Sequence, residues 1–430
     1  MIKRVSVLFA TMAIVISACS SSGASTSPGG ASVAPASQAP AETTAASTGA
    51  GGAGATLIIW ADEKRAKAIT PLAAAWAAEN GVTVKVESIA TDITTKFKTA
   101  SQAGNPPDVV VWAHDVIGDF VQNSAIDPIQ GLDTSGFDPI AIKGMTFAGQ
   151  LYGVPYSVEN IALIRNTDLA PDAPATMEDL QVVGKKLVTD KKATDILALQ
   201  VGQKGDPYHI YPVFTSGGGS FFGLTADGDP DPKLVTVDSP ESIAAGQKLY
   251  DMGEKGTGAL KRSIDDKNAI PLFTGKKVAF LVSGPWSIAD VIRSGVPYDV
   301  GPIPPFADGT PAGPFIGVNG FYVASKGANK TLAQEFVTSL VPTLDFQVGL
   351  YQAEPRRPAL TAAVDQVKAD DPNIPKFAEA AKSGVILPAI PAMGQVWTPF
   401  GVAEAAIVGG ADPAVALTAA AKAIREGIGK

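Results

Sequence analysis

Apolar and polar positions follow one another in segments that predict strands and helices in turn. Residues 56–60 form a continuous apolar run, typical of a strand that is covered on both faces. A helix is expected next, because Ile69, Leu72 and Trp76 recur at intervals of three and four residues, which also predicts Trp76 in the core. Asn80-Gly81 then provides the residues preferred where a helix ends in a left-handed conformation.

The following segments repeat this order. Residues 82–86 alternate as a strand, residues 92–103 predict a helix, and residues 109–111 form a short β-branched strand. This succession predicts an α/β fold on a mostly parallel, doubly wound sheet. Residues 149–165 predict a tight turn and then one strand long enough to pass from one domain into another.

The rest of the chain continues the alternation and ends in alanine-rich helices. Further helices are expected at residues 174–188, 239–255 and 331–340, and further strands at residues 278–282, 300–305 and 320–324.

Tryptophans follow two of the expected strands. Trp112, His114 and Asp115 come directly after residues 109–111, and Trp286 follows residues 278–282. Ligand crevices form at the carboxyl ends of strands in α/β sheets, and an aromatic face beside a carboxylate suits a sugar, which has both CH faces and hydroxyls. The alternative is a core tryptophan, with Asp115 serving only as a helix N-cap.

The N-terminus has the features of an export signal. Residues 1–18 combine a basic start with an apolar stretch too short to span a bilayer. Ile16-Ser17-Ala18-Cys19 resembles a bacterial lipobox, which implies cleavage before Cys19 and attachment of lipid to its sulfur. Residues 19–55 are mainly Ser, Gly, Ala, Pro and Thr and predict a disordered tether. We therefore expect an extracytoplasmic lipoprotein anchored to the cell membrane.

Composition excludes several classes of function. The 430 residues, 46% of them hydrophobic, allow two or more domains, and a net charge of −8 with no basic stripe argues against nucleic acid. His114 and His209 are the only histidines and Cys19 is the only cysteine, so neither a metal site nor a Ser-His-Asp triad is expected. His114 is interpreted as a hydrogen-bonded structural residue, and no cofactor is predicted.

Seven blocks of sequence together resemble the maltose/maltodextrin-binding proteins, the extracellular solute receptors of sugar ABC importers. They occur in order over nearly the whole chain from Thr56 onward. Two of them are Ser283-Gly-Pro-Trp286 and Pro314-Phe-Ile-Gly-Val318. The complete set is residues 57–60, 107–115, 151–168, 206–208, 283–286, 314–318 and 386–397.

The resemblance implies the two-lobe periplasmic-binding-protein fold of the class II type, with the ligand in a cleft between lobes. Each lobe is expected to be a mostly parallel sheet flanked by helices. Three segments would cross between the lobes, near residues 157–160, 314–320 and 355–360. The N-terminal lobe would hold residues 56–157 and 320–357, and the C-terminal lobe residues 160–314 and 358–430.

The resemblance also implies a ligand-binding set that combines aromatic and charged side chains. The stacking rings would be Trp112, Tyr208, Tyr211, Trp286 and Trp397, and the polar groups Glu63, Lys64, Asp115, Glu159 and Asp206. Whether Asp62 or Glu63 meets the ligand is open, with Glu63 preferred. Val116 and Gly401 stand where the best-known members have basic residues, which leaves room for longer or cyclic glucans or another disaccharide instead of maltose.

These features predict a monomeric receptor for a maltodextrin-like α-glucan, which passes its sugar to the permease of an ABC importer after hinge closure. A secreted glycoside-acting enzyme that uses Asp115 and Glu159 as a carboxylate pair is the alternative. Glycerol phosphate, a peptide or iron as cargo is a third possibility. Anionic cargo is disfavoured, because the expected cleft offers mainly acids with Lys64.

Overall fold

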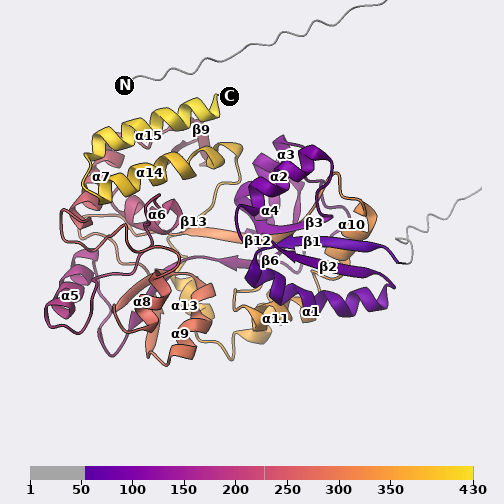
Figure 1. Cartoon of the computed structure of the whole chain (residues 1–430), viewed down its shortest axis with the longest axis horizontal. Helices are drawn as coiled ribbons and strands as arrows, with labels where there is room; N and C mark the ends of the chain where they lie inside the picture. The colour runs from indigo at the N-terminus through magenta and orange to yellow at the C-terminus, as the bar shows by residue number, and fades with distance from the viewer. Residues whose placement is uncertain (1–53, 227, 430) are drawn as a thin grey trace, which may run out of the picture. The chain divides into compact units, whose positions relative to one another are not determined.

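The structure, a computed structural model, describes residues 54–226 and 228–429. The expected signal sequence and Cys19 lie outside the described residues, as does all but the last part of the tether. Within the described ranges, no helix is both long and apolar enough to cross a membrane. The α/β fold class is confirmed, with helices around two main sheets (Figure 1).

The first sheet has a parallel part and an antiparallel part. Strand β1 pairs in parallel with β2 and β3, whereas β12 runs antiparallel to both β3 and β6 and parallel to β13. The strands are β1 (Thr56–Ala61), β2 (Thr83–Ser88), β3 (Val109–Ala113), β6 (Gly153–Glu159), β12 (Phe315–Val323) and β13 (Val385–Ile386). The predicted β-α-β-α-β start of the fold is therefore confirmed.

Helices pack on this sheet to form the first core. Helix α1 is capped by Asp62, whose carboxylate accepts the Arg65 backbone N–H at 3.0 Å. Its Trp76 is buried edge-on against Phe336. The expectation that Trp76 lies in the core is confirmed. The helices here are α1 (Glu63–Glu79), α2 (Ile93–Ala103), α3 (Ile117–Gln122), α4 (Pro139–Met145), α10 (Lys330–Ser339) and α11 (Leu344–Ala353). Two short strands, β4 (Thr146–Phe147) and β5 (Gln150–Leu151), form a separate hairpin.

The second main sheet is antiparallel, where a mostly parallel one was expected. Strand β7 (Ala162–Asn166) lies between β10 (Phe280–Ser283) and β11 (Tyr298–Gly301) and runs against both. One parallel bridge, between Ala198 and Leu281, adjoins it. Strand direction is set by the connections and not by the apolar pattern, so the sequence did not reveal it.

The second core surrounds this sheet. Its helices include α5, which starts with a capping box between Thr176 and Asp179. The elements are α5 (Met177–Thr189), α6 (Pro207–Ser216), α7 (Pro240–Met252), α8 (Ala269–Thr274), α9 (Ile288–Ser294), α13 (Asn373–Ala380), α14 (Trp397–Val408) and α15 (Pro413–Ile428), with the hairpin β8 (Phe222–Leu224) and β9 (Pro230–Val235). The remaining α12 (Thr361–Val367) packs on α11.

The chain changes core within two strand regions. The single long strand expected at residues 149–165 is two strands, because β6 and β7 are separated at Asn160 and Ile161 and belong to different sheets. Val158 contributes to the first core, and Ile161 to the second. Within β12 the same change occurs between Phe315, in the second core, and Ile316, in the first.

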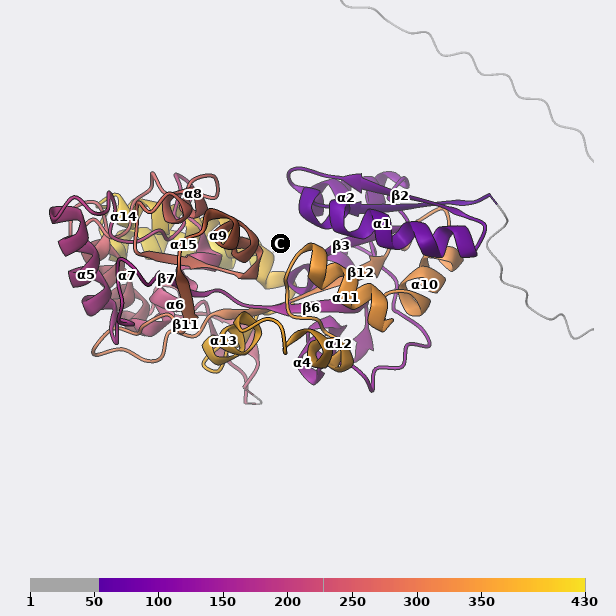
Figure 2. The same ribbon diagram turned by 90° about the horizontal axis from the view of Figure 1, so that it is seen from below.

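A third segment lies beside these two. The Val158 N–H donates to the Arg357 carbonyl at 2.9 Å, and the Ala359 N–H donates to the Tyr156 carbonyl at 3.0 Å. Because β6 also pairs with β12, three segments far apart in the sequence run side by side where the chain changes core (Figure 2).

Candidate ligand-binding site

Five aromatic side chains of the second core form what we call the aromatic cluster: Tyr208, Tyr211, Trp286, Phe315 and Trp397. The Tyr211 and Phe315 rings are stacked with centroids 3.6 Å apart and planes at 15°. The Phe315 ring also lies 6.2 Å from that of Tyr208 and 6.3 Å from that of Trp397, while Tyr208 lies 6.4 Å from Trp286. The structure therefore brings together four of the five predicted stacking residues.

Phe315 is the residue around which this cluster is built, and the sequence did not single it out. It is buried at the start of β12, whereas the other four rings are only partly buried. In the sequence it is one apolar residue of a resembling block, with nothing to distinguish it from an ordinary core position. Its role depends on where β12 enters the second core.

Trp112 and Asp115 come from the other core, at the end of β3 and in the short helix η1 (His114–Val116). His114, between Trp112 and Asp115, connects the end of β3 to β12 and to residue 387 by two hydrogen bonds. Its Nδ1 accepts the Val318 backbone N–H at 3.0 Å, which leaves Nε2 to donate to the Leu387 carbonyl at 2.7 Å. Burial lowers the pKa of His114 to about 4, so the ring is neutral. The structural role expected for His114 is confirmed.

Burial affects the ionisation of Tyr208 in the aromatic cluster and of Asp115 in the first core. Burial raises the pKa of the Tyr208 hydroxyl well above its usual value, and the charges of Glu159 and Asp115 add to this effect. The carboxyl of Asp115 itself is partly covered, and burial raises its pKa to about 7. A group that ionises near neutral pH can serve either as a hydrogen-bond acceptor or as a donor.

Arg65 lies over the ring of Trp112. Its buried guanidinium carbon lies 5.4 Å from the Trp112 ring centre, a cation–π distance. Nε donates to the Tyr156 hydroxyl at 2.8 Å, Nη2 donates to Asn319 at 2.6 Å, and Nη1 pairs with Asp62. Burial opposes ionisation of Asp62, but the adjacent Arg65 outweighs it and holds the pKa of that carboxyl below its usual value.

Arg356 lies over the ring of Trp286 in the same way. Its guanidinium carbon lies 5.4 Å from the Trp286 ring, Nη1 pairs with Glu159, and Nη2 lies 2.9 Å from Glu354. All three charged side chains are almost fully buried, with 8% to 11% of their surface exposed. Burial works against the charge of Arg356, yet Glu159 and the other nearby acids raise its pKa well above the usual value.

Asp62, Arg65, Glu159, Glu354 and Arg356 form what we call the charged cluster, and it corrects one expectation. The sequence predicted mainly acids with Lys64, whereas two buried arginines stand behind the two tryptophans. Three carboxylates face these two guanidiniums, so the cluster carries no excess of positive charge. Both arginines of the charged cluster are paired with carboxylates, so neither is available to bind an anionic cargo.

Asp206 is held by its neighbours at the start of α6. Its carboxylate accepts the His209 backbone N–H at 3.1 Å and the His209 Nδ1–H at 2.9 Å, and its own N–H donates to the buried Glu404 at 2.8 Å. Burial raises the pKa of Asp206, but His209 outweighs this effect and the net shift is downward. The His209 ring lies 6.1 Å from Trp286, so this network joins the aromatic cluster.

The start of α1 reaches the same region. Lys64 Nζ donates to the Trp286 carbonyl at 3.3 Å, a contact between elements of the two cores. Asp62 belongs to the charged cluster, whereas Glu63 is exposed in the first turn of α1. The structure gives Glu63 no position among the aromatic or charged cluster residues.

Gly401 has a steric reason to lack a side chain. A Cβ at Gly401 would come 2.6 Å from the Lys204 carbonyl oxygen, and a Cβ at Gly205 would come 2.0 Å from the Gly401 carbonyl oxygen. Gly205 also has a φ of +77°, which favours glycine. The loop before α6 therefore packs directly on α14. Val116, the other departure, is partly buried against the first core.

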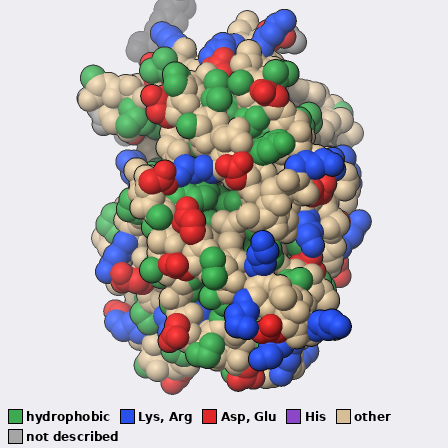
Figure 3. Space-filling model, turned by 90° about the vertical axis from the view of Figure 1, so that its left-hand side faces the viewer, with side chains coloured by type: hydrophobic (Ala, Val, Ile, Leu, Met, Phe, Trp, Pro, Cys, Tyr) green, Lys and Arg blue, Asp and Glu red, His purple; other side chains and the backbone are tan. Residues whose placement is uncertain are grey.

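The face of the second core away from the first sheet carries mixed charge. Figure 3 shows Lys and Arg side chains interspersed there with Asp and Glu. This face has no basic stripe of the kind that binds a phosphate backbone.

The two clusters place aromatic rings and charged side chains close together, and comparison with known proteins identifies the family to which this sequence belongs. Residues 71–376 match the family of bacterial extracellular solute-binding proteins. The chain belongs to this family.

Relatives of this chain include the galactooligosaccharide-binding protein of Bacillus subtilis (strain 168), 28% identical over 86% of this chain and 88% of the relative. The maltotriose-binding protein of Pyrococcus abyssi (strain GE5 / Orsay) is 27% identical over 71% of this chain and 66% of its own length. The maltodextrin-binding protein MdxE of Bacillus subtilis (strain 168) is 28% identical over 74% of this chain and 77% of the relative. All three names are those of binding proteins.

Replacing Asp115 with Asn should stabilise the protein in a pH-dependent way. The pKa is raised from 3.8 to about 7, so ionisation of the folded protein is unfavourable, and wild-type stability should fall as the pH rises from about 4 to 7. We expect Asp115→Asn to gain about 1–3 kcal/mol at pH 8, since the carboxyl is only partly covered, and little at pH 4. Urea unfolding at the two pH values measures this. An equal gain at both values would contradict the assigned burial of the carboxyl.

Proposed function

We propose that this protein is the extracytoplasmic receptor for a neutral oligosaccharide, which it delivers to the permease of an ABC importer. The observation that carries the proposal is the aromatic cluster of the second core, whose Trp286 carbonyl accepts a hydrogen bond from Lys64 of the first core. In this proposal Trp112 and Asp115 of the first core complete the site. Rings stack on the CH faces of sugar units, and charged groups make the stronger hydrogen bonds to hydroxyls. The family supports a solute receptor.

The preferred sugar in this proposal is a maltodextrin-like α-glucan. Two relatives are named for maltotriose and maltodextrin, and a third for galactooligosaccharides. Galactose and glucose differ in one hydroxyl orientation, so the discriminating groups would be charged side chains close to the rings, such as Asp115 and Asp206. Four partly exposed aromatic side chains near one another suit an oligosaccharide better than a single sugar.

Isothermal titration with a sugar panel tests this proposal. The panel is maltose, maltotriose, longer maltodextrins, cyclodextrin, a β-galactooligosaccharide, trehalose and sucrose. We expect saturable binding, tightest for a linear maltodextrin. Tightest binding of the galactooligosaccharide would support an oligosaccharide receptor but contradict the α-glucan as its preferred ligand. If no sugar of the panel binds, the proposal of an oligosaccharide receptor is wrong.

We further propose that the cores belong to two lobes, residues 56–157 with 320–357 and residues 160–314 with 358–430, which close on the sugar. Rings from both lobes can contact one ligand only when the lobes approach. The radius of gyration should therefore fall when a saturating sugar is added, as measured by small-angle X-ray scattering. A particle of unchanged size at saturation would contradict hinge closure.

In this proposal the protein binds sugar without reaction and needs no cofactor. The alternative enzyme would use Asp115 and Glu159, but Glu159 is paired with Arg356, which favours a structural carboxylate. Maltodextrin should therefore be recovered intact after long incubation with pure protein. Release of reducing ends that is abolished by Glu159→Gln would favour the glycoside-acting enzyme.

We also propose that the mature protein begins at Cys19 and is held at the cell membrane by lipid on that residue. Replacing Cys19 with Ala should release the protein into the medium, because one signal for stable membrane attachment is lost. Fractionation of cells that express each form measures this. A variant that stays with the membrane as fully as the wild type would contradict lipid anchoring through Cys19.

A further inference from the structure

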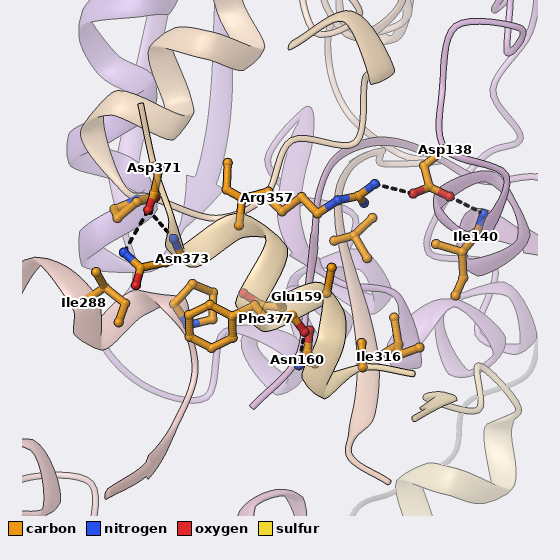
Figure 4. Close-up of a pocket in the computed structure, with 16 residues that line it drawn as sticks. Asp138, Ile140, Glu159, Asn160, Ile288, Ile316, Arg357, Asp371, Asn373 and Phe377 are labelled. Carbon is orange, nitrogen blue, oxygen red and sulfur yellow. Dashed lines mark hydrogen bonds and ion pairs between the residues drawn. The ribbon is translucent and has the colours of Figure 1, made fainter. Parts of the chain in front are cut away.

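A cavity of about 220 Å³ lies where β6, β12 and the third segment run side by side, and none of the five rings of the aromatic cluster lines it. Val158 and Glu159 of β6, Ile316 of β12, and Pro355 and Arg357 of the third segment form its middle. Residues of α4 border it from the first core and residues of α9 and α13 from the second (Figure 4). Elements of both cores, the two strand regions in which the chain changes core and the third segment beside them therefore share one cavity.

Three of the four charged side chains of this wall are in ion pairs, and the fourth, Asp371, accepts hydrogen bonds from neutral donors. Asp138 accepts from Arg357 at 2.8 Å, and Glu159 pairs with Arg356. Asp371 accepts the Asn373 N–H at 2.7 Å and also the Tyr351 hydroxyl. Figure 4 shows the first of these pairs at one side of the cavity and Asp371 with Asn373 at the other.

The surface left for a ligand is mainly apolar. This surface is formed by branched aliphatic side chains and one phenylalanine: Ile140, Val158, Ile288, Ile316, Ile374 and Phe377. An uncharged apolar molecule fits such a wall, since a charged one would be desolvated without a free partner. An engineered apolar cavity of about 150 Å³ binds benzene, so 220 Å³ holds a substituted benzene ring.

We propose that this cavity is a second binding site, which takes a small uncharged molecule with an aromatic or branched aliphatic body and thereby strengthens oligosaccharide binding. The effect on sugar rests on the proposed function, whereas the site itself does not. Glu159 and Arg357 line the cavity, and Arg356 between Arg357 and Pro355 pairs with Glu159 and lies over Trp286. An occupant therefore contacts the residues that position one ring of the aromatic cluster.

The direction of coupling follows from the arrangement that contains the cavity. In the same structure Lys64, at the start of α1 in the first core, donates to the carbonyl of Trp286, which packs on the second core. The cavity is therefore present while the two cores are in contact at the aromatic cluster. A molecule that fits the cavity stabilises this arrangement. By linkage, sugar and the small molecule must strengthen each other's binding by the same factor.

The test uses 4-fluorobenzyl alcohol as the probe and follows its own ¹⁹F NMR signal with the purified full chain without its lipid. Ala381→Phe, just after α13, and Ala378→Phe, on α13, add a ring to the lining of the cavity, and Ala419→Phe adds the same ring to the exposed face of α15 as a control. We expect saturable binding to the wild type and to Ala419→Phe, with at least a tenfold loss in both filling variants. 4-Fluorobenzoate, which is anionic, should not bind.

Absence of saturable binding to the wild type, equal binding to folded filling variants, or tighter binding of the benzoate would overturn the site. Two filling variants are used so that one misfolded protein does not decide the result. Saturating probe should then tighten maltodextrin binding by about fivefold, and maltodextrin should tighten probe binding equally. Unchanged sugar affinity would overturn the coupling. If no sugar binds while the probe does, the proposed function fails and the second site stands.

Discussion

Truncating Trp286 to Ala should weaken oligosaccharide binding by roughly 2–4 kcal/mol, or about 30- to 1000-fold in Kd. Trp286 links the aromatic cluster to the charged cluster and to Lys64. It lies 6.4 Å from Tyr208 and 6.1 Å from His209, its carbonyl accepts from Lys64, and the Arg356 guanidinium stands 5.4 Å from its centre. Isothermal titration with the best sugar of the panel measures the loss.

Trp76→Ala is the matched control, because it removes the same side chain from the interior of the first core. Trp76 packs edge-on against Phe336 at 5.1 Å and its indole N–H donates to Ser339 at 3.2 Å. The variant should lose about 3–5 kcal/mol of stability while the folded fraction binds sugar almost as before. Wild-type affinity in folded Trp286→Ala would contradict the aromatic cluster as a sugar site, even though the chain would still belong to its family.

The sequence predicted the first sheet well because local pattern determines its early elements. Continuous apolar runs such as residues 56–60 and 109–111 mark buried strands, and helical periodicity placed Trp76 in the core correctly. The division of residues 149–165 into β6 and β7 was missed, since the apolar run continues through the point where the chain changes sheet. The antiparallel second sheet was missed because no local signal encodes strand direction.

The site was predicted in part for the same reason. Tyr208, Trp286 and Trp397 are large aromatics in recognisable blocks, and Tyr211 follows one of them. Tyr208, Tyr211 and Trp397 lie around one centre, with Trp286 beside Tyr208. That centre, Phe315, has the sequence character of any core residue. Arg356 was missed because its meaning depends on Glu159, 197 positions earlier in the chain. Only the folded structure shows that Arg356 is buried and paired with Glu159.

Replacing Arg356 with Met should destabilise the protein by about 3–5 kcal/mol, since it leaves Glu159 and Glu354 buried without their cation. The neighbouring Arg357→Met is the control. Arg357 pairs with Asp138 at 2.8 Å, but 29% and 21% of the two side chains are exposed, so its loss should cost less than about 1 kcal/mol. Urea unfolding of each variant gives the free energies.

Adding Glu159→Gln to Arg356→Met should recover part of the lost stability, because one of the two unpaired buried carboxylates is then neutral. Glu159→Gln alone should destabilise the wild type, in which Arg356 needs that acid. The same second substitution thus stabilises one background and destabilises the other, a reversal of sign that arises only when the two side chains interact. If Glu159→Gln destabilises both backgrounds equally, Arg356 and Glu159 are not coupled, and the positioning of Trp286 through this pair is wrong.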